Sequence, residues 1–347
     1  MRVIFAGGGT AGHILPAIIV AEELKKKNVD MYFIVSNRGI EREILIKKGY
    51  PFYEQKLRPF KRTNIVNQII SVLLIFIESI KLLSIIRKKE KILLLGGFAS
   101  LPAGIAGAIK KCDIYIHEQN SSMGLANKIF APLANKVFLS FENTKNAKGR
   151  LLYTGYPVRQ EFKLIRRKEK FEKRLLVLGG SQGSRKINQL IVSCALILLE
   201  KGYHIAHQTG KKLYEETMEL YKNEGLSNIK VLNIFPFYDN VASLYNWADI
   251  VIARAGAGTI FEVLSAKRPT IFIPLKSSAD NHQYINALYA SKSGYTFILK
   301  EDDANVESLV KLICHIADKY DCEIKHNLDD RQNVSATEKI MEAMNVI

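Results

Sequence analysis

Two glycine-rich loops, one near the start of the chain and one just past its middle, most constrain the fold. Near the start the apolar run Val3–Ala6 leads into Gly7–Gly12, and past the middle Leu175–Leu178 leads into Gly179–Gly183. An amphipathic stretch follows each loop, as in a strand that turns through glycines into a helix. Each half of the chain therefore opens as a β-loop-α unit.

Short apolar runs alternate with helical stretches along the rest of the chain. Helices are expected from about Pro16 and from about Ser184. Further strands are predicted at Met31–Val35, Ile92–Leu95, Ile114–His117, Val137–Leu139, Val231–Ile234, Ile250–Ala253 and Thr270–Ile273. Such alternation indicates parallel sheets covered by helices. Because 347 residues exceed the usual size of one core, we expect an α/β protein of two Rossmann-like domains.

The segment Thr154–Arg159 interrupts this alternation, and the charge-dense residues 166–170 follow it. Glycine, proline and clustered charge favour a linker there. We therefore predict a first domain over residues 1–157 and a second over residues 158–330. Residues 331–347 contain a last helical stretch, Ala336–Ala343, which we expect to pack back onto the domains.

Composition restricts the partners. The chain carries 50 Lys and Arg against 34 Asp and Glu, a net charge of +16. This charge favours an anionic partner, which phospholipid, nucleic acid or a phosphorylated substrate would each satisfy. The four cysteines have no CxxC pairing or nearby histidine pattern, so we expect free thiols in a reducing cytoplasm and no metal site.

The chain begins with an apolar strand and lacks the basic start and cleavage site of a signal peptide, which predicts a cytoplasmic protein. Residues 65–86 are rich in Ile and Leu. Glu78 and Lys81 stand within this stretch and would be costly in lipid. We therefore expect one or two amphipathic helices there and no membrane span.

A glycine loop between a strand and a helix aims free amides at the helix N-terminus, where partial positive charge favours phosphate. The alternative is that the glycines of such a loop only permit tight packing of the backbone. A dinucleotide oxidoreductase would need an acidic residue at the end of the second strand, where Ser36 and Asn37 stand instead. Neither loop ends in Gly-Lys-Ser/Thr, which counts against a kinase-type P-loop.

The combined motifs resemble the MurG family of glycosyltransferases along nearly the whole chain. Seven matching stretches arrive in the family's order: Gly7–Pro16, Gly96–Ser100, His117–Asn120, Gly155–Arg159, Gly179–Arg185, Arg254–Glu262 and Asp280–Gln283. The resemblance implies a GT-B fold whose two domains face each other across a cleft. It also implies transfer of N-acetylglucosamine from UDP-N-acetylglucosamine to the C4 hydroxyl of a polyprenyl-pyrophosphoryl-MurNAc-peptide, with inversion, in peptidoglycan synthesis.

The same resemblance assigns donor binding chiefly to the second domain. Ser181 and its neighbours would hold the diphosphate, Glu262 the ribose, Tyr238 the uracil, and Arg159 would contact the nucleotide from across the cleft. The full donor set implied is Thr10, Ala11, Gly12, Asn120, Arg159, Ser181, Gln182, Gly183, Tyr238, Ala257, Gly258, Thr259, Ile260, Phe261, Glu262, His282 and Gln283. His282 stands where some relatives have a second glutamine.

The first domain would receive the acceptor. Its diphosphate is expected to face Gly9, Thr10, Gly12, Gly96, Gly97 and Ser100. His13 is the candidate base that removes the hydroxyl proton, because a neutral histidine is basic near its ordinary pKa of about 6.5. The alternative is that His13 only caps the helix or orients substrate. No tightly bound cofactor is implied, although a loosely associated magnesium ion is compatible with this chemistry.

A lipid-linked acceptor places the enzyme at the cytoplasmic face of the cell membrane, as a peripheral protein. The expected contact with anionic lipid comprises Leu73, Leu74, Ile75 and Phe76, flanked by Lys61, Arg62, Arg87 and Lys88. About half of the aliphatic residues in 65–86 should instead be core.

Two other functions stay open. A UDP-N-acetylglucosamine epimerase can share the fold and the donor chemistry, but would need neither the second N-terminal glycine loop nor the apolar patch. A non-catalytic basic protein that binds membrane or RNA would explain the charge but not the paired loops. Since no RNA-binding signature is present, no nucleic-acid partner is expected.

Overall fold

The computed structural model describes residues 1–8, 11–37, 40–58, 65–180, 182–226, 229–324 and 335–346. The chain divides into two compact units, one formed by Met1–Pro157 with Asn333–Ile347 and the other by Val158–Gln332. The long segment of the first unit thus ends at Pro157, the position that the sequence gives as a domain boundary. The C-terminal segment belongs to the first unit, where its helix contacts the first helix of the chain.

The first unit is built on a seven-stranded sheet in which every pairing is parallel, in the order β3-β2-β1-β4-β5-β6-β7. The strands are β1 (Arg2–Ala6), β2 (Asp30–Ser36), β3 (Phe52–Gln55), β4 (Lys91–Leu94), β5 (Asp113–Glu118), β6 (Lys136–Leu139) and β7 (Leu151–Tyr153). In β1, Val3 and Phe5 enter one buried cluster while Ile4 and Ala6 enter another. This alternation shows that both faces of the sheet are covered.

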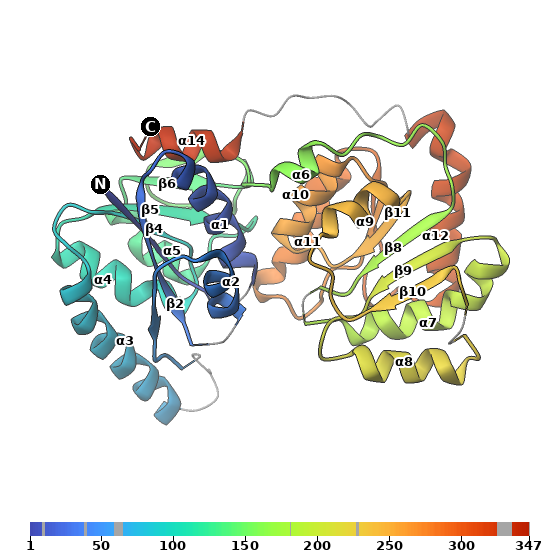
Figure 1. The fold of residues 1–347 in the computed structure, drawn as a ribbon, viewed down its shortest axis with the longest axis horizontal. Coiled ribbons are helices and arrows are strands. Elements are labelled where there is room, and N and C mark those ends of the chain that lie inside the picture. Colours follow the sequence, from blue (N-terminus) through green and yellow to red (C-terminus); the bar gives the residue numbers. More distant parts are fainter. Residues whose placement is uncertain are drawn as a thin grey trace. The chain divides into compact units, whose positions relative to one another are not determined.

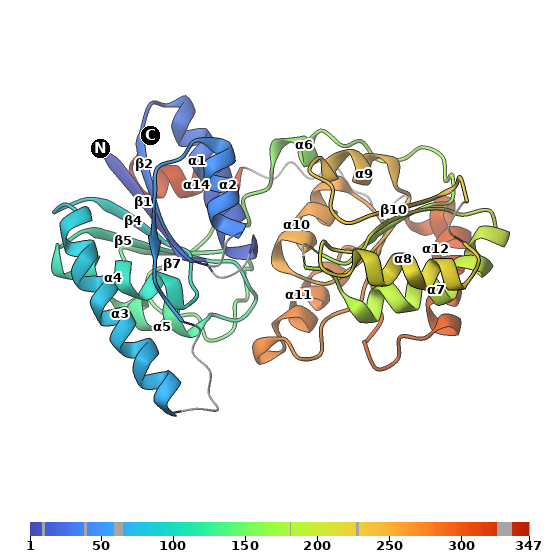
Figure 2. The same cartoon turned by 60° about the horizontal axis from the view of Figure 1, so that its bottom comes forward.

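Helices cover the two faces of this sheet in separate layers, which Figures 1 and 2 show. One layer contains α1 (Ala11–Lys26), α2 (Ile40–Lys48) and α14 (Ala336–Ala343). The other contains α3 (Ile65–Ile85), α4 (Leu101–Ile109) and α5 (Leu125–Phe130), with the short turns η1 (Phe98–Ser100) and η2 (Ala131–Leu133). Both faces of the sheet are therefore packed against helices.

Helix α1 begins at Ala11, so the expected start near Pro16 is wrong. Proline favours a first turn and glycine disfavours helix, which is why the sequence suggests the later start. The buried side chain of Ile14, which joins the core, outweighs that preference. The earlier start places His13 on the helix, one turn before Pro16.

Helix α3 is a single helix, long and apolar enough by length and composition to cross a membrane over Asn67–Ile85. One side of it packs on the protein. Glu78 is buried there, accepts a hydrogen bond of 2.9 Å from the hydroxyl of Tyr53 and pairs with Lys81 at 2.8 Å. Leu82 enters the core beneath the sheet. These contacts join α3 to β3 and place it in the layer of a folded domain.

The second unit is a six-stranded parallel sheet in the order β10-β9-β8-β11-β12-β13. Its strands are β8 (Arg174–Leu178), β9 (His204–Gln208), β10 (Leu232–Phe235), β11 (Ile250–Ala253), β12 (Thr270–Phe272) and β13 (Thr296–Ile298). Its helical segments are α6 (Gln160–Lys163), α7 (Arg185–Glu200), α8 (Tyr214–Asn223), α9 (Val241–Trp247), α10 (Ala257–Ala266), η3 (Ala279–Asn281), α11 (His282–Ser291), α12 (Val306–Lys319) and the π-helical turn η4 (Tyr320–Ile324). The core on one face lies under α7 and α12.

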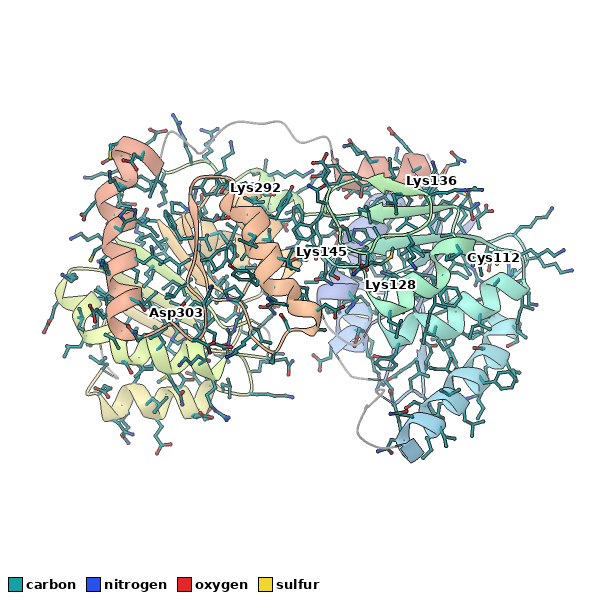
Figure 3. The ribbon with its side chains drawn as sticks, turned by 180° about the vertical axis from the view of Figure 1, so that it is seen from behind. Cys112, Lys128, Lys136, Lys145, Lys292 and Asp303 are labelled. Carbon is teal, nitrogen blue, oxygen red and sulfur yellow. The ribbon has the colours of Figure 1, made fainter. Side chains whose placement is uncertain are left out.

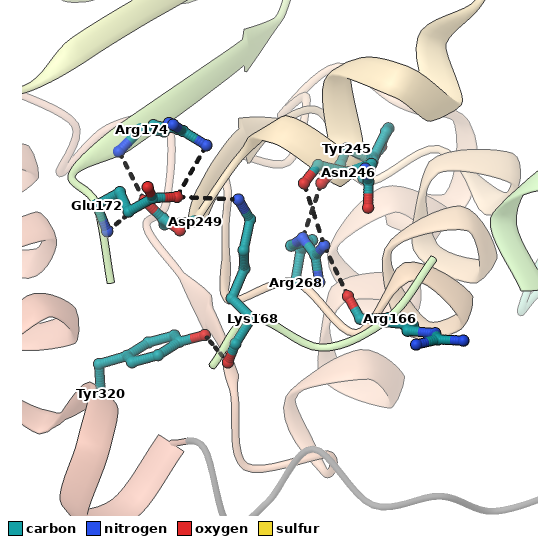
Figure 4. A network of polar contacts seen from close by, with 9 residues as sticks. All are labelled: Arg166, Lys168, Glu172, Arg174, Tyr245, Asn246, Asp249, Arg268 and Tyr320. Atoms are coloured by element: carbon teal, nitrogen blue, oxygen red, sulfur yellow. Dashed lines mark hydrogen bonds and ion pairs between the residues drawn. The ribbon is translucent and has the colours of Figure 1, made fainter. Parts of the chain in front are cut away.

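A buried polar network fixes the segment that leads into β8 (Figure 4). The guanidinium of Arg268 donates to the carbonyl of Tyr245 at 2.7 Å, of Ala266 at 2.9 Å and of Arg166 at 2.9 Å. Two of these carbonyls lie in the last turns of α9 and α10, where a cation is favoured. Burial lowers the pKa of Arg268 to about 10. One side chain therefore joins two helices to the entering segment.

Candidate active site

The donor-side residues of the second unit lie where parallel strands end. The loop after β8 contains Gln182 and Gly183, while Ser181 lies outside the described residues. Gly183 packs against Gly210, which follows β9 with a φ of 88°. A Cβ on Gly210 would lie 2.1 Å from the amide nitrogen of Gly183, so only glycine fits this contact. The close approach of two loops shapes the turn that is predicted to hold a diphosphate.

The N-terminus of α10 lies at the same edge, directly after β11. The helix begins at Ala257, and Gly256 caps it without a side-chain hydrogen bond. Its first turns contain the predicted donor residues Ala257, Gly258, Thr259, Ile260, Phe261 and Glu262. The backbone amides of a first turn have no partner inside the helix, so this end can bind an anion.

Glu262 forms an ion pair with Arg159, whose Nη2 lies 3.1 Å from Oε1 of the carboxylate. Arg159 was expected to reach the nucleotide from across the cleft, but it belongs to the same compact unit as Glu262. Its guanidinium also lies over the ring of Phe162, with 4.9 Å to the centroid. Burial raises the pKa of Glu262, and the charge and hydrogen bond of Arg159 oppose this rise. The arginine is thus the counter-charge of the carboxylate.

Arg254, the first residue of the motif before α10, connects several of these loops. It donates to Oγ of Ser184 at 3.1 Å, to the carbonyl of Ile273 at 3.0 Å and to Glu301 at 2.6 Å. The second oxygen of Glu301 accepts from the amide of Lys276 at 3.1 Å. The ends of β8, β12 and β13 are therefore held together through one arginine.

The remaining donor residues of this unit lie on neighbouring segments. Tyr238 is partly exposed, and its ring is 5.6 Å from that of Phe235. Oε1 of Gln283 accepts from the amide of Leu275 at 3.0 Å, so this side chain orders the loop before it. Nδ1 of His282 lies 2.7 Å from the carbonyl of Ala279. Both residues begin α11, and their backbone bonds fix where that helix starts.

In the first unit, the loops after β1 and β4 touch each other. A Cβ on Gly97, whose φ is 71°, would lie 2.7 Å from the carbonyl oxygen of Gly8 and 3.9 Å from Nε2 of His13. His13 therefore faces the loop of Gly96 and Gly97 that follows β4. Gly12 is exposed beside it, and Gly96 precedes the contact, whereas Gly9 and Thr10 lie outside the described residues.

Ser100 differs from its prediction. It was expected to face the acceptor diphosphate, but its side chain is fully buried and its hydroxyl donates to the carbonyl of Gly97 at 2.8 Å. The residue ends η1 just before α4, and its hydroxyl adds a second hydrogen bond to a carbonyl that already accepts from the amide of Ser100 at 3.2 Å. Ser100 therefore braces the loop.

Behind His13 lies a second histidine, His117, at the end of β5. It is buried, and Oγ of Ser140 lies 3.1 Å from its Nε2. Burial, and to a smaller extent the charge of His13, lowers the pKa of His117 to about 3. The neutral form of His117 is therefore favoured.

Glu118, the next residue, orders the loop that contains Asn120. One carboxylate oxygen accepts from the amide of Asn120 at 3.0 Å, and the other from Gly124 at 2.9 Å and from Asn127 at 2.8 Å. Burial raises the pKa of Glu118, which these hydrogen bonds oppose. The half-buried Asn120 belongs to the first unit, as do Ala11 and Gly12 of the predicted donor set.

No group of three His, Cys, Asp or Glu residues within the described ranges could hold a metal ion.

The predicted membrane residues of α3 fall into two groups by exposure. Leu73 and Phe76 are exposed by 55% and 61%, whereas Leu74 and Ile75 are half-buried. The outward face is completed by Ile69, Val72, Ile77 and Ile80. Arg87 and Lys88 are exposed after the helix, and Lys61 and Arg62 lie outside the described residues.

No role was predicted from the sequence for Glu301 or for the loop contact at Gly210. Position offers a signal for both, because each follows a strand of a parallel sheet, at the edge where ligands bind in open α/β folds. The partners of these residues, distant along the chain, cannot be read from the motifs.

Two family models match the chain in order. The glycosyltransferase family 28 N-terminal domain matches residues 3–139, and the glycosyltransferase family 28 C-terminal domain matches residues 174–343. The UDP-N-acetylglucosamine--N-acetylmuramyl-(pentapeptide) pyrophosphoryl-undecaprenol N-acetylglucosamine transferase of Halothermothrix orenii is 35% identical over 332 residues. That alignment covers 90% of this chain and 89% of the relative.

Solved structures agree. The crystal structure of Acinetobacter baumannii MurG covers 100% of this chain and 99% of its own, with a TM-score of 0.75 and 25% identity. A Listeria monocytogenes structure described as a putative UDP-N-acetylglucosamine 2-epimerase has a TM-score of 0.69 with 11% identity, covering 99% and 95% of the two chains. The latter likeness concerns the fold alone. The two parallel-sheet units have the GT-B architecture that the sequence predicts.

Proposed function

Because this chain belongs to the MurG family within glycosyltransferase family 28, we propose that it transfers N-acetylglucosamine from UDP-N-acetylglucosamine to lipid-linked N-acetylmuramyl-pentapeptide in peptidoglycan synthesis. The observation that carries this proposal is the 35% identity to a transferase of that name over 90% of the chain. An epimerase of similar fold is the weaker candidate, since its likeness rests on 11% identity.

The donor site of the proposal lies on the second unit. The N-terminus of α10 and the loop after β8 offer backbone amides to the diphosphate, which gains negative charge as UDP departs. The carboxylate of Glu262 can accept hydrogen bonds from ribose hydroxyls, and the charge of Arg159 favours its ionised form. A loosely associated magnesium ion is compatible with this arrangement.

His13 is the base in this proposal. Its Nε2 faces the loop at Gly97, beside the glycines that would bind the acceptor diphosphate. From there it would take the proton of the muramyl C4 hydroxyl as that oxygen attacks the anomeric carbon of the donor, and the bond to UDP breaks. Inversion follows from this single displacement.

The enzyme would act on the cytoplasmic face of the membrane as a peripheral protein. Exposed apolar side chains at positions 69, 72, 73, 76 and 80 recur at helical spacing, and so form one outward face of α3. Cations at Arg87 and Lys88 end this face, which suits shallow insertion into anionic lipid. A role in cell wall synthesis would also link the protein to cell shape and division.

The proposal is tested by supplying labelled UDP-N-acetylglucosamine with a lipid-linked muramyl-peptide and measuring labelled disaccharide-lipid. His13→Ala should lower kcat by a factor of about 100 or more, as expected for loss of a general base. Glu262→Ala should chiefly raise the KM of the donor. Undiminished turnover by His13→Ala would overturn the role of His13 as the base but not the transferase function.

A further inference from the structure

A cavity of about 400 Å³ opens in the first unit. Its walls combine loop residues with one side of α3: Asn37, Lys56, Leu57, Arg58, Ile70 and Leu74. We refer to this cavity as the junction pocket. None of its lining residues was predicted to bind a substrate, although Leu74, Lys56 and Arg58 belong to or flank the stretch that was expected to contact the membrane.

The pocket lies at the carboxyl edge of the sheet. Asn37 directly follows β2, and Lys56 and Arg58 follow β3. In the strand order β3-β2-β1-β4, the next two strands end in the loops of Gly7 and Gly96. With strands about 4.8 Å apart, two spacings place β3 about 10 Å from β1. The pocket is thus a short step along one edge from the proposed acceptor diphosphate loops.

Two kinds of chemistry meet in the junction pocket. Lys56 and Arg58 are exposed, and among the described residues neither has an ion-pair partner. Ile70 and Leu74 are half-buried aliphatic side chains of α3. Uncompensated cations attract phosphate, and an aliphatic wall attracts hydrocarbon. A ligand with a phosphate next to a hydrocarbon chain would satisfy both walls.

The pocket is also continuous with the outward face of α3. Leu74 lines it, while Leu73 and Phe76 on the same turns face solvent. A hydrocarbon chain could therefore pass from the proposed membrane face into the pocket along one helix. Its phosphate end would then point along the sheet edge toward Gly7 and Gly96.

We propose that the junction pocket binds the part of the acceptor where the polyprenyl chain meets the diphosphate. This inference rests on the proposed transferase function and adds a binding site to it. Lys56 and Arg58 contact the phosphate nearer the lipid, and Ile70 and Leu74 contact the first units of the hydrocarbon. A phospholipid headgroup shares this chemistry, but the position between the glycine loops and the apolar helix favours the acceptor.

The test is the double variant Lys56→Gln/Arg58→Gln, assayed in neutral detergent micelles with a long-chain lipid-linked acceptor. The KM of the acceptor should rise about tenfold, because two charge contacts with phosphate are lost. The KM of the donor and kcat at saturating acceptor should stay as in the wild type. Lys136→Gln is the matched control. It removes one exposed charge of the same unit at the amino end of β6, which is the opposite edge of the sheet (Figure 3).

A second arm separates the hydrocarbon contact and the phospholipid. Leu74→Ala should raise the KM of the long-chain acceptor but not of an acceptor whose chain is cut to one isoprene unit. If the double variant keeps its acceptor KM in micelles and loses only binding to phosphatidylglycerol vesicles, the pocket serves phospholipid and the proposal is overturned. No transfer by the wild type would instead overturn the proposed function on which it rests.

Discussion

Arg159 and Glu262, 103 residues apart in the sequence, form an ion pair of 3.1 Å within the second unit. The pair joins the start of α6 to the second turn of α10. It gives a partly buried carboxylate a counter-charge that favours its ionised form. Glu262, the residue expected to bind the ribose, is thus positioned by Arg159.

The first prediction concerns pH. Burial raises the pKa of Glu262, and Arg159 opposes the rise, so protonation of the carboxyl at low pH should weaken donor binding. Arg159→Met removes the opposing charge and lets the pKa rise further. The acid limb of kcat/KM for the donor should therefore move to higher pH. Arg167→Met, which disrupts an exposed pair of the same unit, should leave the limb in place. An unmoved limb in Arg159→Met would contradict the assigned role.

The second prediction concerns the pair of Arg254 and Glu301, which is mostly buried at 2.6 Å. Arg254→Met and Glu301→Gln should each raise the KM of the donor about tenfold with a smaller change in kcat, since the loops lose their alignment. The double variant should be little worse than either single one, because the two residues act as a unit.

The nearby pair Lys276–Asp302 supplies a matched control for this cycle. It has the same length but is exposed, so Lys276→Met should change the donor KM little. Fully additive effects of Arg254→Met and Glu301→Gln would show that the pair does not act as a unit.

The third prediction concerns stability. Arg268→Met removes the donor from two buried carbonyls, each costing about 1–3 kcal/mol when left without a partner, and from the part-buried carbonyl of Arg166. We expect a clear fall in the denaturant midpoint of the second unit. Arg185→Met is the control, because that arginine is exposed and pairs with Glu216 at the surface. A midpoint in Arg268→Met equal to that of the control would refute the network's structural role.

The fourth prediction concerns membrane binding. Phe76→Gln removes an exposed aromatic side chain from α3 and should weaken sedimentation with vesicles that contain phosphatidylglycerol. Thermal stability should be unchanged because the side chain contacts solvent. Leu196→Gln makes a similar change on α7 of the second unit and should not affect vesicle binding. Equal losses in both variants would argue against a specific membrane face.

Apolar runs predict the centre of the fold well. Strand β11 occupies the expected Ile250–Ala253, and α14 occupies the expected Ala336–Ala343. Strand β9 was missed because His204, His207 and Gln208 hide it. The buried His207 is compatible with a strand since its nitrogens meet Tyr221 at 2.9 Å and Asn188 at 3.2 Å. Such long-range partners are what periodicity cannot reveal.

The candidate site, like the fold, could be predicted from the sequence only in part. Motifs identify residues that are near each other in sequence, as in the turn before Glu262 or the glycines before His13. They do not show that Ser100 is turned inward to Gly97, or that Arg159 pairs with Glu262. Burial and pairing of polar groups depend on tertiary packing, which no local pattern contains.

The central claim is sugar transfer to a lipid-linked acceptor, and identification of the product tests it most directly. Wild-type protein is incubated with labelled UDP-N-acetylglucosamine and polyprenyl-pyrophosphoryl-MurNAc-pentapeptide, and the lipid fraction is analysed by mass spectrometry and nuclear magnetic resonance. The account predicts one added N-acetylhexosamine, joined to the C4 oxygen with inverted anomeric configuration, together with free UDP. Label that stays out of the lipid, or that appears as an epimerised sugar, would contradict it.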